Sequence, residues 1–95
     1  MPYIKQEHRE QLDKALEDLM IAIVTLTEDG KQIIPGPGVY NYVISALLSV
    51  PYGYKTSYGK INEAIGVLEC AKLELYRRVA APYEDQKIKE HGDVY

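Results

Sequence analysis

Apolar residues recur at steps of three and four along residues 58–81, which is the spacing of one face of an α-helix. The main stripe of this stretch consists of Ile61, Ile65, Leu68, Leu75 and Val79. A second stripe runs through Ala64, Val67 and Ala71, so apolar or small residues cover most of the circumference. A helix of this kind is buried on more than one side. We therefore predict a central helix over residues 58–81, about 35 Å long.

Gly66 lies in the middle of this predicted helix, where glycine costs about 1 kcal/mol relative to alanine. With Cys70 it forms a small-x-x-x-small spacing that allows another helix to approach closely. The alternative is that the glycine is merely tolerated. Pro82 predicts the end of the helix, and it also suits the first turn of a short polar helix over residues 83–91, which Gly92 would end.

Two further helices are predicted on the N-terminal side. Residues 6–26 form an amphipathic pattern, and residues 39–50 form a second core helix that stops at the following proline. Residues 31–38 are predicted to be a loop, because proline and glycine alternate there. Ser57 is the expected N-cap of the central helix, without a capping box because Lys60 stands where a glutamate would be needed.

These elements predict an all-α fold. It is a small helical bundle of three main helices plus a short C-terminal helix, in a single domain of residues 1–95. We expect the second and third helices to form the core hairpin, with the first helix packed across them.

The composition narrows the functional classes. The 95 residues are 46% hydrophobic and 26% charged, which is ordinary for a globular domain, and the net charge of −3 argues against broad nucleic-acid binding. One cysteine excludes an internal disulfide and suits a reducing compartment. No stretch resembles a membrane span or a signal peptide. We therefore expect a cytoplasmic protein with no membrane partner.

The aromatic residues are nine tyrosines, with no phenylalanine and no tryptophan. Tyrosine joins an apolar ring to a hydroxyl group that needs a partner when it is buried. This usage indicates interfaces or pockets. The alternative is that tyrosine simply replaces phenylalanine at the edge of the core.

The segment INEAIGVLECAKLELYRRVAAPYEDQKIKEHGDVY, residues 61–95, resembles a family of small uncharacterised proteins encoded by tailed phages and prophages. PYI at residues 2–4 and NYVI at residues 41–44 match two further elements of the family pattern. The chain departs from it at Leu75, where relatives often have Phe, and at His91, where Asn is common. The resemblance implies a phage or prophage accessory protein and no particular activity.

The sharpest polar cluster lies on the predicted central helix. Arginine presents a planar fork that matches phosphate or carboxylate, and tyrosine stacks on nucleotide bases. The N-terminus of the second core helix would add donors for an anion. The candidate ligand-binding residues are Asn41, Tyr42, Glu69, Lys72, Tyr76, Arg77, Arg78 and Tyr83. The alternative is a solvated set of ion pairs between helix neighbours, with Glu74 in reach of both arginines.

Signals for catalysis are weaker. Two pairs of carboxylates have the spacing found in Mg²⁺-dependent helical nucleotide pyrophosphohydrolases, namely Glu7 with Glu10 and Glu90 with Asp93. Both pairs lie near the ends of the chain. Cys70 lies among apolar neighbours and is expected to be inert packing. The two histidines lack ligand-like spacing, so we predict no metal site and no cofactor.

We predict a homo-oligomer, because the central helix has more apolar surface than two partner helices would cover. The leading functional hypothesis is a non-catalytic phage or prophage protein that sequesters a small anionic, nucleotide-like ligand. The second hypothesis is a protein–protein adaptor without a small-molecule ligand, which holds another subunit or a host protein. The third is a metal-dependent nucleotide pyrophosphohydrolase-like enzyme.

Overall fold

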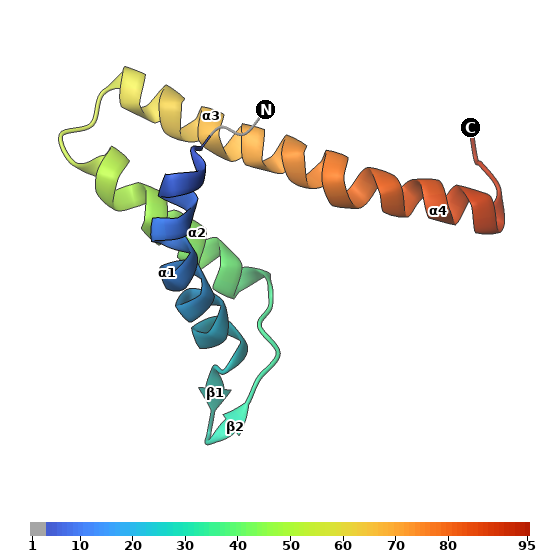
Figure 1. The fold of residues 1–95 in the computed structure, drawn as a ribbon, viewed down its shortest axis with the longest axis horizontal. Coiled ribbons are helices and arrows are strands. Elements are labelled where there is room, and N and C mark those ends of the chain that lie inside the picture. Colours follow the sequence, from blue (N-terminus) through green and yellow to red (C-terminus); the bar gives the residue numbers. More distant parts are fainter. Residues whose placement is uncertain (1–3) are drawn as a thin grey trace. The chain divides into compact units, whose positions relative to one another are not determined.

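The computed structural model describes residues 4–95 and shows an all-α protein with three long helices, as the sequence predicted (Figure 1). Pro2 and Tyr3, from the PYI opening, lie outside the described residues. The chain divides into two units, one up to Ala46 and one from Leu47 onwards. The elements in chain order are α1 (Gln6–Val24), β1 (Thr27–Glu28), β2 (Lys31–Gln32), α2 (Pro37–Gly53), α3 (Tyr58–Leu75), η1 (Tyr76–Ala80) and α4 (Ala81–His91). The single domain of residues 1–95 and the core hairpin of the second and third helices stay predictions.

Helix α1 begins where the sequence predicted and ends at Val24, two residues early. The Thr25 side chain ends it by donating a hydrogen bond to the carbonyl of Ile21 at 2.7 Å. Most of the helix surface is exposed, and an ion pair of 2.6 Å joins Lys14 to Asp18 on it. Ile23 is only 8% exposed, and among the described residues it is the one buried hydrophobic side chain. The core of this unit is therefore centred on the last turn of α1.

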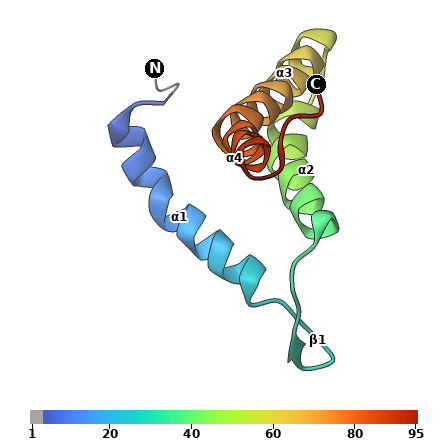
Figure 2. The same ribbon diagram turned by 90° about the vertical axis from the view of Figure 1, so that its right-hand side faces the viewer.

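A short hairpin follows α1, where the sequence predicted only a helix end and a loop (Figure 2). Strand β1 pairs antiparallel with β2, and the turn between them holds Asp29 at φ 53° and Gly30 at φ 77°. Positive φ at both central residues is the geometry that joins tightly twisted strands, and Asp-Gly is a preferred sequence for it. The Gln32 side chain donates to the Val24 carbonyl at 2.6 Å, which attaches the hairpin to α1.

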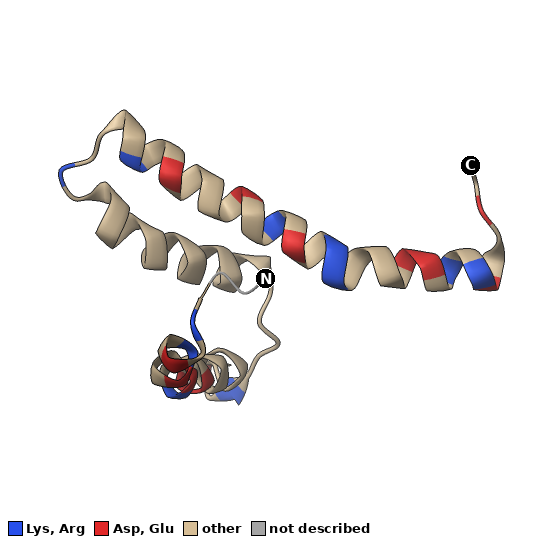
Figure 3. Cartoon of the chain, turned by 45° about the horizontal axis from the view of Figure 1, so that its top comes forward, with Lys and Arg blue, Asp and Glu red and all other residues tan. Residues whose placement is uncertain are grey.

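Helix α2 is longer at both ends than the predicted residues 39–50. It begins at Pro37, because the fixed φ of proline suits the first helical position and no N–H is needed there. The prediction that Pro51 stops this helix is wrong, since α2 continues to Gly53. In the last turn a proline removes one hydrogen bond and leaves the earlier turns intact. Helix α2 has no charged side chain, as Figure 3 shows.

Helix α3 starts at the predicted cap. The Ser57 hydroxyl accepts a hydrogen bond from the backbone N–H of Lys60 at 3.2 Å. The Lys60 ammonium group donates to the carbonyls of Tyr54 and Lys55, both at 3.3 Å, and thereby holds the preceding turn. Lys55 has a φ of 48° in that turn. The start of α3 is therefore stabilised by both the backbone and the side chain of one lysine.

The central helix is not covered on several sides within one chain, so that prediction is wrong for the single chain. Val67 is 44% exposed, Leu73 is 56% exposed and Cys70 is also exposed. The interpretation of Cys70 as buried packing is therefore wrong too. The physical reason is that a chain of 95 residues has too few other elements to surround a helix that is apolar on most of its circumference.

Gly66 is expected to be replaceable by alanine with a gain in stability. The helix passes through Gly66 without a break, and an added Cβ would meet no atom within 4 Å. Gly66→Ala should raise the free energy of unfolding by about 0.5–1 kcal/mol, because alanine has less backbone entropy to lose. Urea unfolding followed by circular dichroism measures this. Gly92→Ala is the opposite control, since Gly92 has a φ of 85° and should lose stability. A loss of stability in Gly66→Ala would contradict the expectation.

The helical segment does not end before Pro82, as Figure 1 shows. Helix α3 continues into the π-helical turn η1 and then into α4, and Pro82 lies in the first turn of α4. The backbone N–H of Ala81 bonds to the carbonyl of Tyr76, which closes a turn over five residues instead of four. Proline lacks an N–H and crowds the carbonyl four residues back, and a wider turn relieves that crowding. The predicted stop at Gly92 is confirmed.

Candidate functional site

The predicted polar cluster forms ion pairs along the surface of α3 and η1. Lys72 lies 3.0 Å from Glu69, and Arg78 lies 3.3 Å from Glu74. All four side chains are at least 44% exposed, so each pair contributes only a few tenths of a kcal/mol. Figure 3 shows charges of both signs following one another along this helical segment. These contacts are those of the solvated ion-pair alternative.

Arg77 differs from its neighbour in this cluster. The structure gives it no hydrogen bond and no ion pair with any residue between 4 and 95, and Glu74 bonds to Arg78 instead. An arginine fork without an internal partner is available to a carboxylate or a phosphate. Arg77 is therefore the residue of the predicted set whose charge is most accessible to a ligand.

The other predicted residues lie in different parts of the chain. Asn41 and Tyr42 lie on α2 within the first unit, and Tyr42 is 74% exposed. Tyr76 begins η1, and Tyr83 lies in the first turn of α4. These two tyrosines border a cavity.

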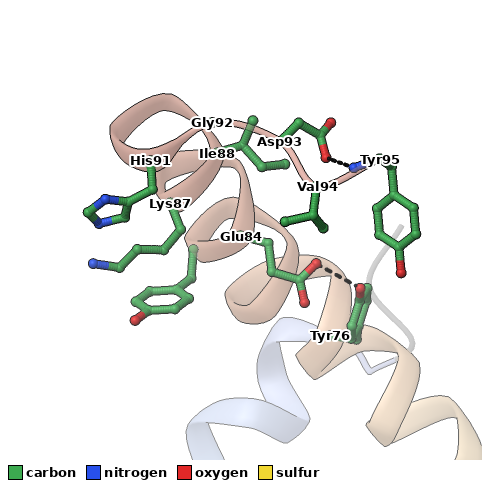
Figure 4. A pocket seen from close by; sticks show the side chains of 10 residues that line it. Tyr76, Glu84, Lys87, Ile88, His91, Gly92, Asp93, Val94 and Tyr95 are labelled. Atoms are coloured by element: carbon green, nitrogen blue, oxygen red, sulfur yellow. Dashed lines mark hydrogen bonds between the residues drawn. The ribbon is translucent and has the colours of Figure 1, made fainter.

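That cavity is an open groove of about 680 Å³ on α4 and the C-terminal tail, drawn in Figure 4. Its volume lies within the range of small-molecule sites, about 300–1,000 Å³. The lining residues are Tyr76, Tyr83, Glu84, Lys87, Ile88, His91, Gly92, Asp93, Val94 and Tyr95. The groove holds carboxylates beside a lysine and a histidine, so its charges favour neither an anion nor a cation.

The tail borders the groove because the chain changes direction after α4. Gly92 has a φ of 85°, and its N–H bonds to the carbonyl of Ile88 at 2.8 Å. The Asp93 carboxylate then accepts a hydrogen bond from the backbone N–H of Tyr95 at 2.9 Å (Figure 4). Val94 and Tyr95 remain fully or almost fully exposed, so they border the groove without filling it.

Two residues that line the groove are joined by a hydrogen bond across the π-helical turn. The Tyr76 hydroxyl donates to the Glu84 carboxylate at 3.0 Å. In a regular α-helix, residues eight apart point about 80° apart around the axis, whereas seven apart point the same way. The extra residue in η1 brings Tyr76 and Glu84 onto one face.

The pKa of Tyr76 is raised by this neighbourhood. The largest cause is the hydrogen bond to Glu84, followed by the negative charge of the same carboxylate, with smaller contributions from desolvation and Asp85. The protonated hydroxyl is therefore favoured in the folded state. Its contribution to stability is present below the pKa of the unfolded chain and is lost as pH rises through the raised folded value.

Tyr76→Phe tests this sign. At about pH 8 the variant should be slightly less stable than the wild type, and the difference should shrink at a pH above the raised pKa of Tyr76. Urea unfolding at both pH values measures the difference. Tyr58→Phe is the control, because Tyr58 is 86% exposed and it is the hydroxyl of Tyr76 that bonds to Glu84. A difference for Tyr76→Phe that persists at high pH would contradict the proposed linkage.

Sequence reasoning missed most of the groove, although it identified the helix and the glycine that build it. The signal was the short helix of residues 83–91 followed by Gly92, which returns the tail beside Glu84 and Ile88. What sequence spacing did not reveal is the change of phase at η1. Glu90 and Asp93 have the spacing of a Mg²⁺-binding pair of carboxylates. In the structure the Glu90 carboxylate bonds to the Lys87 ammonium group at 3.2 Å. Among residues 4–95 there is no group of three potential metal ligands.

The comparisons with known proteins give the family. None of the helices described between residues 4 and 95 is long and apolar enough to cross a membrane. The comparisons with curated proteins and with solved structures gave no significant match. A family model does match, and it covers residues 1–94. The chain belongs to the family described as domain of unknown function DUF6899.

Proposed function

We propose that this chain is a phage- or prophage-encoded accessory protein that works in the host cytoplasm by binding other protein chains, itself included. It has no catalytic role in this proposal. The observation that carries it is the exposure of large apolar side chains on α2 and α3. This proposal favours the adaptor hypothesis over the ligand-sequestering one.

Helix α2 supports the proposal most directly. It has 17 residues and none of them is charged. Tyr42, Leu47 and Val50 are 74%, 60% and 75% exposed. Exposed apolar surface of this extent is typical of interaction sites. Contact between these apolar side chains and water is unfavourable, and binding to a second protein surface would remove that contact.

Helix α3 adds to this exposed apolar surface. Ile65, Leu73 and Leu75 are 60%, 56% and 65% exposed.

Light scattering after size-exclusion chromatography tests the proposal. At micromolar concentration we expect a dimer or a larger oligomer of the full chain, stable on dilution to about 1 μM. The physical reason is the apolar area that association removes from water. A monomer throughout this range, without a host protein bound, would contradict self-association.

A small anionic, nucleotide-like ligand is the second candidate. It is supported by Arg77, which has no ionic partner among residues 4–95, and by Tyr76 and Tyr83 beside the groove. A thermal-shift screen with nucleotides and cyclic dinucleotides tests it. A stabilising compound should lose its effect in Arg77→Ala, with Arg78→Ala as the matched comparison because Glu74 already holds Arg78. No stabilisation by any nucleotide would remove this candidate and leave the adaptor.

A further inference from the structure

We propose that α3 pairs antiparallel with α3 of a second copy of this chain, along one apolar stripe. We call this stripe the α3 seam, and it consists of Ile61, Ile65, Leu68, Lys72, Leu75 and Val79. The inference rests on the proposed function, because it specifies the surface through which two copies associate. The seam begins in the first turn of α3 and reaches into η1.

The spacing of the α3 seam is that of a coiled coil. Its members follow one another at alternating steps of four and three residues, which are the two core positions of a heptad. Each apolar member is partly open to solvent. The exposed fractions are 45% for Ile61, 60% for Ile65, 39% for Leu68, 65% for Leu75 and 59% for Val79. The seam is thus an apolar helix face that is available to a partner.

The same spacing is self-complementary in the antiparallel orientation. A twofold axis beside Cys70 places Ile61 opposite Val79, and Ile65 opposite Leu75. A twofold interface requires this reciprocity, since each residue and its counterpart exchange roles between the copies. Cys70 itself points away from the seam, because it lies about 180° around the helix from its centre. Four layers of the interface are therefore apolar on both sides.

Charge selects the antiparallel orientation over the parallel one. Lys72 is the polar member of the seam, and parallel pairing in register would place its ammonium group against the same group of the second copy. Antiparallel pairing places Lys72 opposite Leu68. The lysine stem can then cover that leucine while its head stays at the edge, where Glu69 already lies 3.0 Å away.

A charge placed in the α3 seam tests the pairing. Ile65→Lys should raise the dissociation constant of the dimer by about 100-fold or more, because it places an unpaired ammonium group opposite an apolar residue of the second copy. The matched control is Leu73→Lys, since Leu73 is 56% exposed, lies on the same helix and is outside the seam. Both positions are exposed in one chain, so both variants should fold, which circular dichroism checks. Sedimentation equilibrium of the full chain measures the constant.

Spin labels test the orientation. Cys70 is the single cysteine, so Cys70→Ser combined with Lys89→Cys gives one label near the end of α4. In an antiparallel pair centred beside residue 70, the two labels should lie roughly 55–60 Å apart, from 1.5 Å per residue. In a parallel pair they should lie within roughly 30 Å. Labels on the native Cys70 should be within roughly 30 Å of each other, which verifies the register.

The outcomes separate this inference from the proposed function. Association that is weakened by Ile65→Lys and not by Leu73→Lys, together with the long distance between the two labels at position 89, supports the α3 seam. Unchanged association in Ile65→Lys overturns the seam and leaves the proposed self-association in place. A short distance at position 89 overturns the antiparallel orientation. A wild-type chain that is monomeric at every concentration overturns the proposed self-association and the seam together.

Discussion

Ile23→Ala is expected to lower the free energy of unfolding by about 2–4 kcal/mol, the usual loss for truncating a buried isoleucine. Ile23 is 8% exposed, whereas its neighbours Ile21 and Val24 in α1 are 51% and 49% exposed. The truncated side chain would leave a cavity near the end of α1, where the Gln32 side chain bonds to the last residue of the helix. Urea unfolding followed by circular dichroism measures the loss.

The control for this prediction is Ile21→Ala. Ile21 lies in the same turn region and is 51% exposed, so its truncation should change stability by less than about 1 kcal/mol. Hydrogen exchange adds a local readout, because the amide of Ile33 bonds to the Leu26 carbonyl at 2.9 Å. Ile23→Ala should speed exchange at that amide. Equal effects of the two alanine variants would contradict a core centred on Ile23.

Pro82→Ala is expected to convert η1 into regular α-helix and to stabilise the chain by about 1–2 kcal/mol. Alanine restores the missing N–H and removes the ring that crowds the preceding turn. The gain is smaller than the full proline penalty, because the π-helical turn already relieves part of it. Without the extra residue in this turn, Tyr76 and Glu84 would point about 80° apart around the helix axis. Their hydrogen bond should break, and the pKa of Tyr76 should fall back toward its ordinary value.

Nuclear magnetic resonance measures both consequences. Chemical shifts of residues 76–81 report the helical geometry, and the titration of the Tyr76 ring reports its pKa. Pro51→Ala is the control, since Pro51 lies in the last turn of α2 and should leave the Tyr76 titration unchanged. A Pro82→Ala variant that keeps the bond from Ala81 to the Tyr76 carbonyl would show that proline is not the cause of the π-helical turn.

The β1–β2 hairpin was missed because its strands gave no signal, although its turn sequence was a clear one. Asp29-Gly30 is a strong turn sequence for a two-residue hairpin. The flanking residues are polar and exposed, so no alternating apolar pattern marked the strands. What holds them is the attachment to α1 through Gln32, which joins positions eight residues apart. Such a bond has no signature in short-range periodicity.

The helices, the Ser57 cap of α3 and the stop at Gly92 followed from the order of residues, because backbone hydrogen bonds and capping contacts join positions three to five apart. The wide turn before Pro82, the pairing of Tyr76 with Glu84 and the groove beside the tail emerged only in three dimensions. Each depends on the rotation of one helical turn relative to the next. One extra residue in a turn barely alters the apolar pattern of the sequence, but it changes the direction in which every later side chain points. An apolar stripe on a helix likewise predicts that the stripe is buried. It does not identify the surface that buries it, because the hydrophobic effect has no direction.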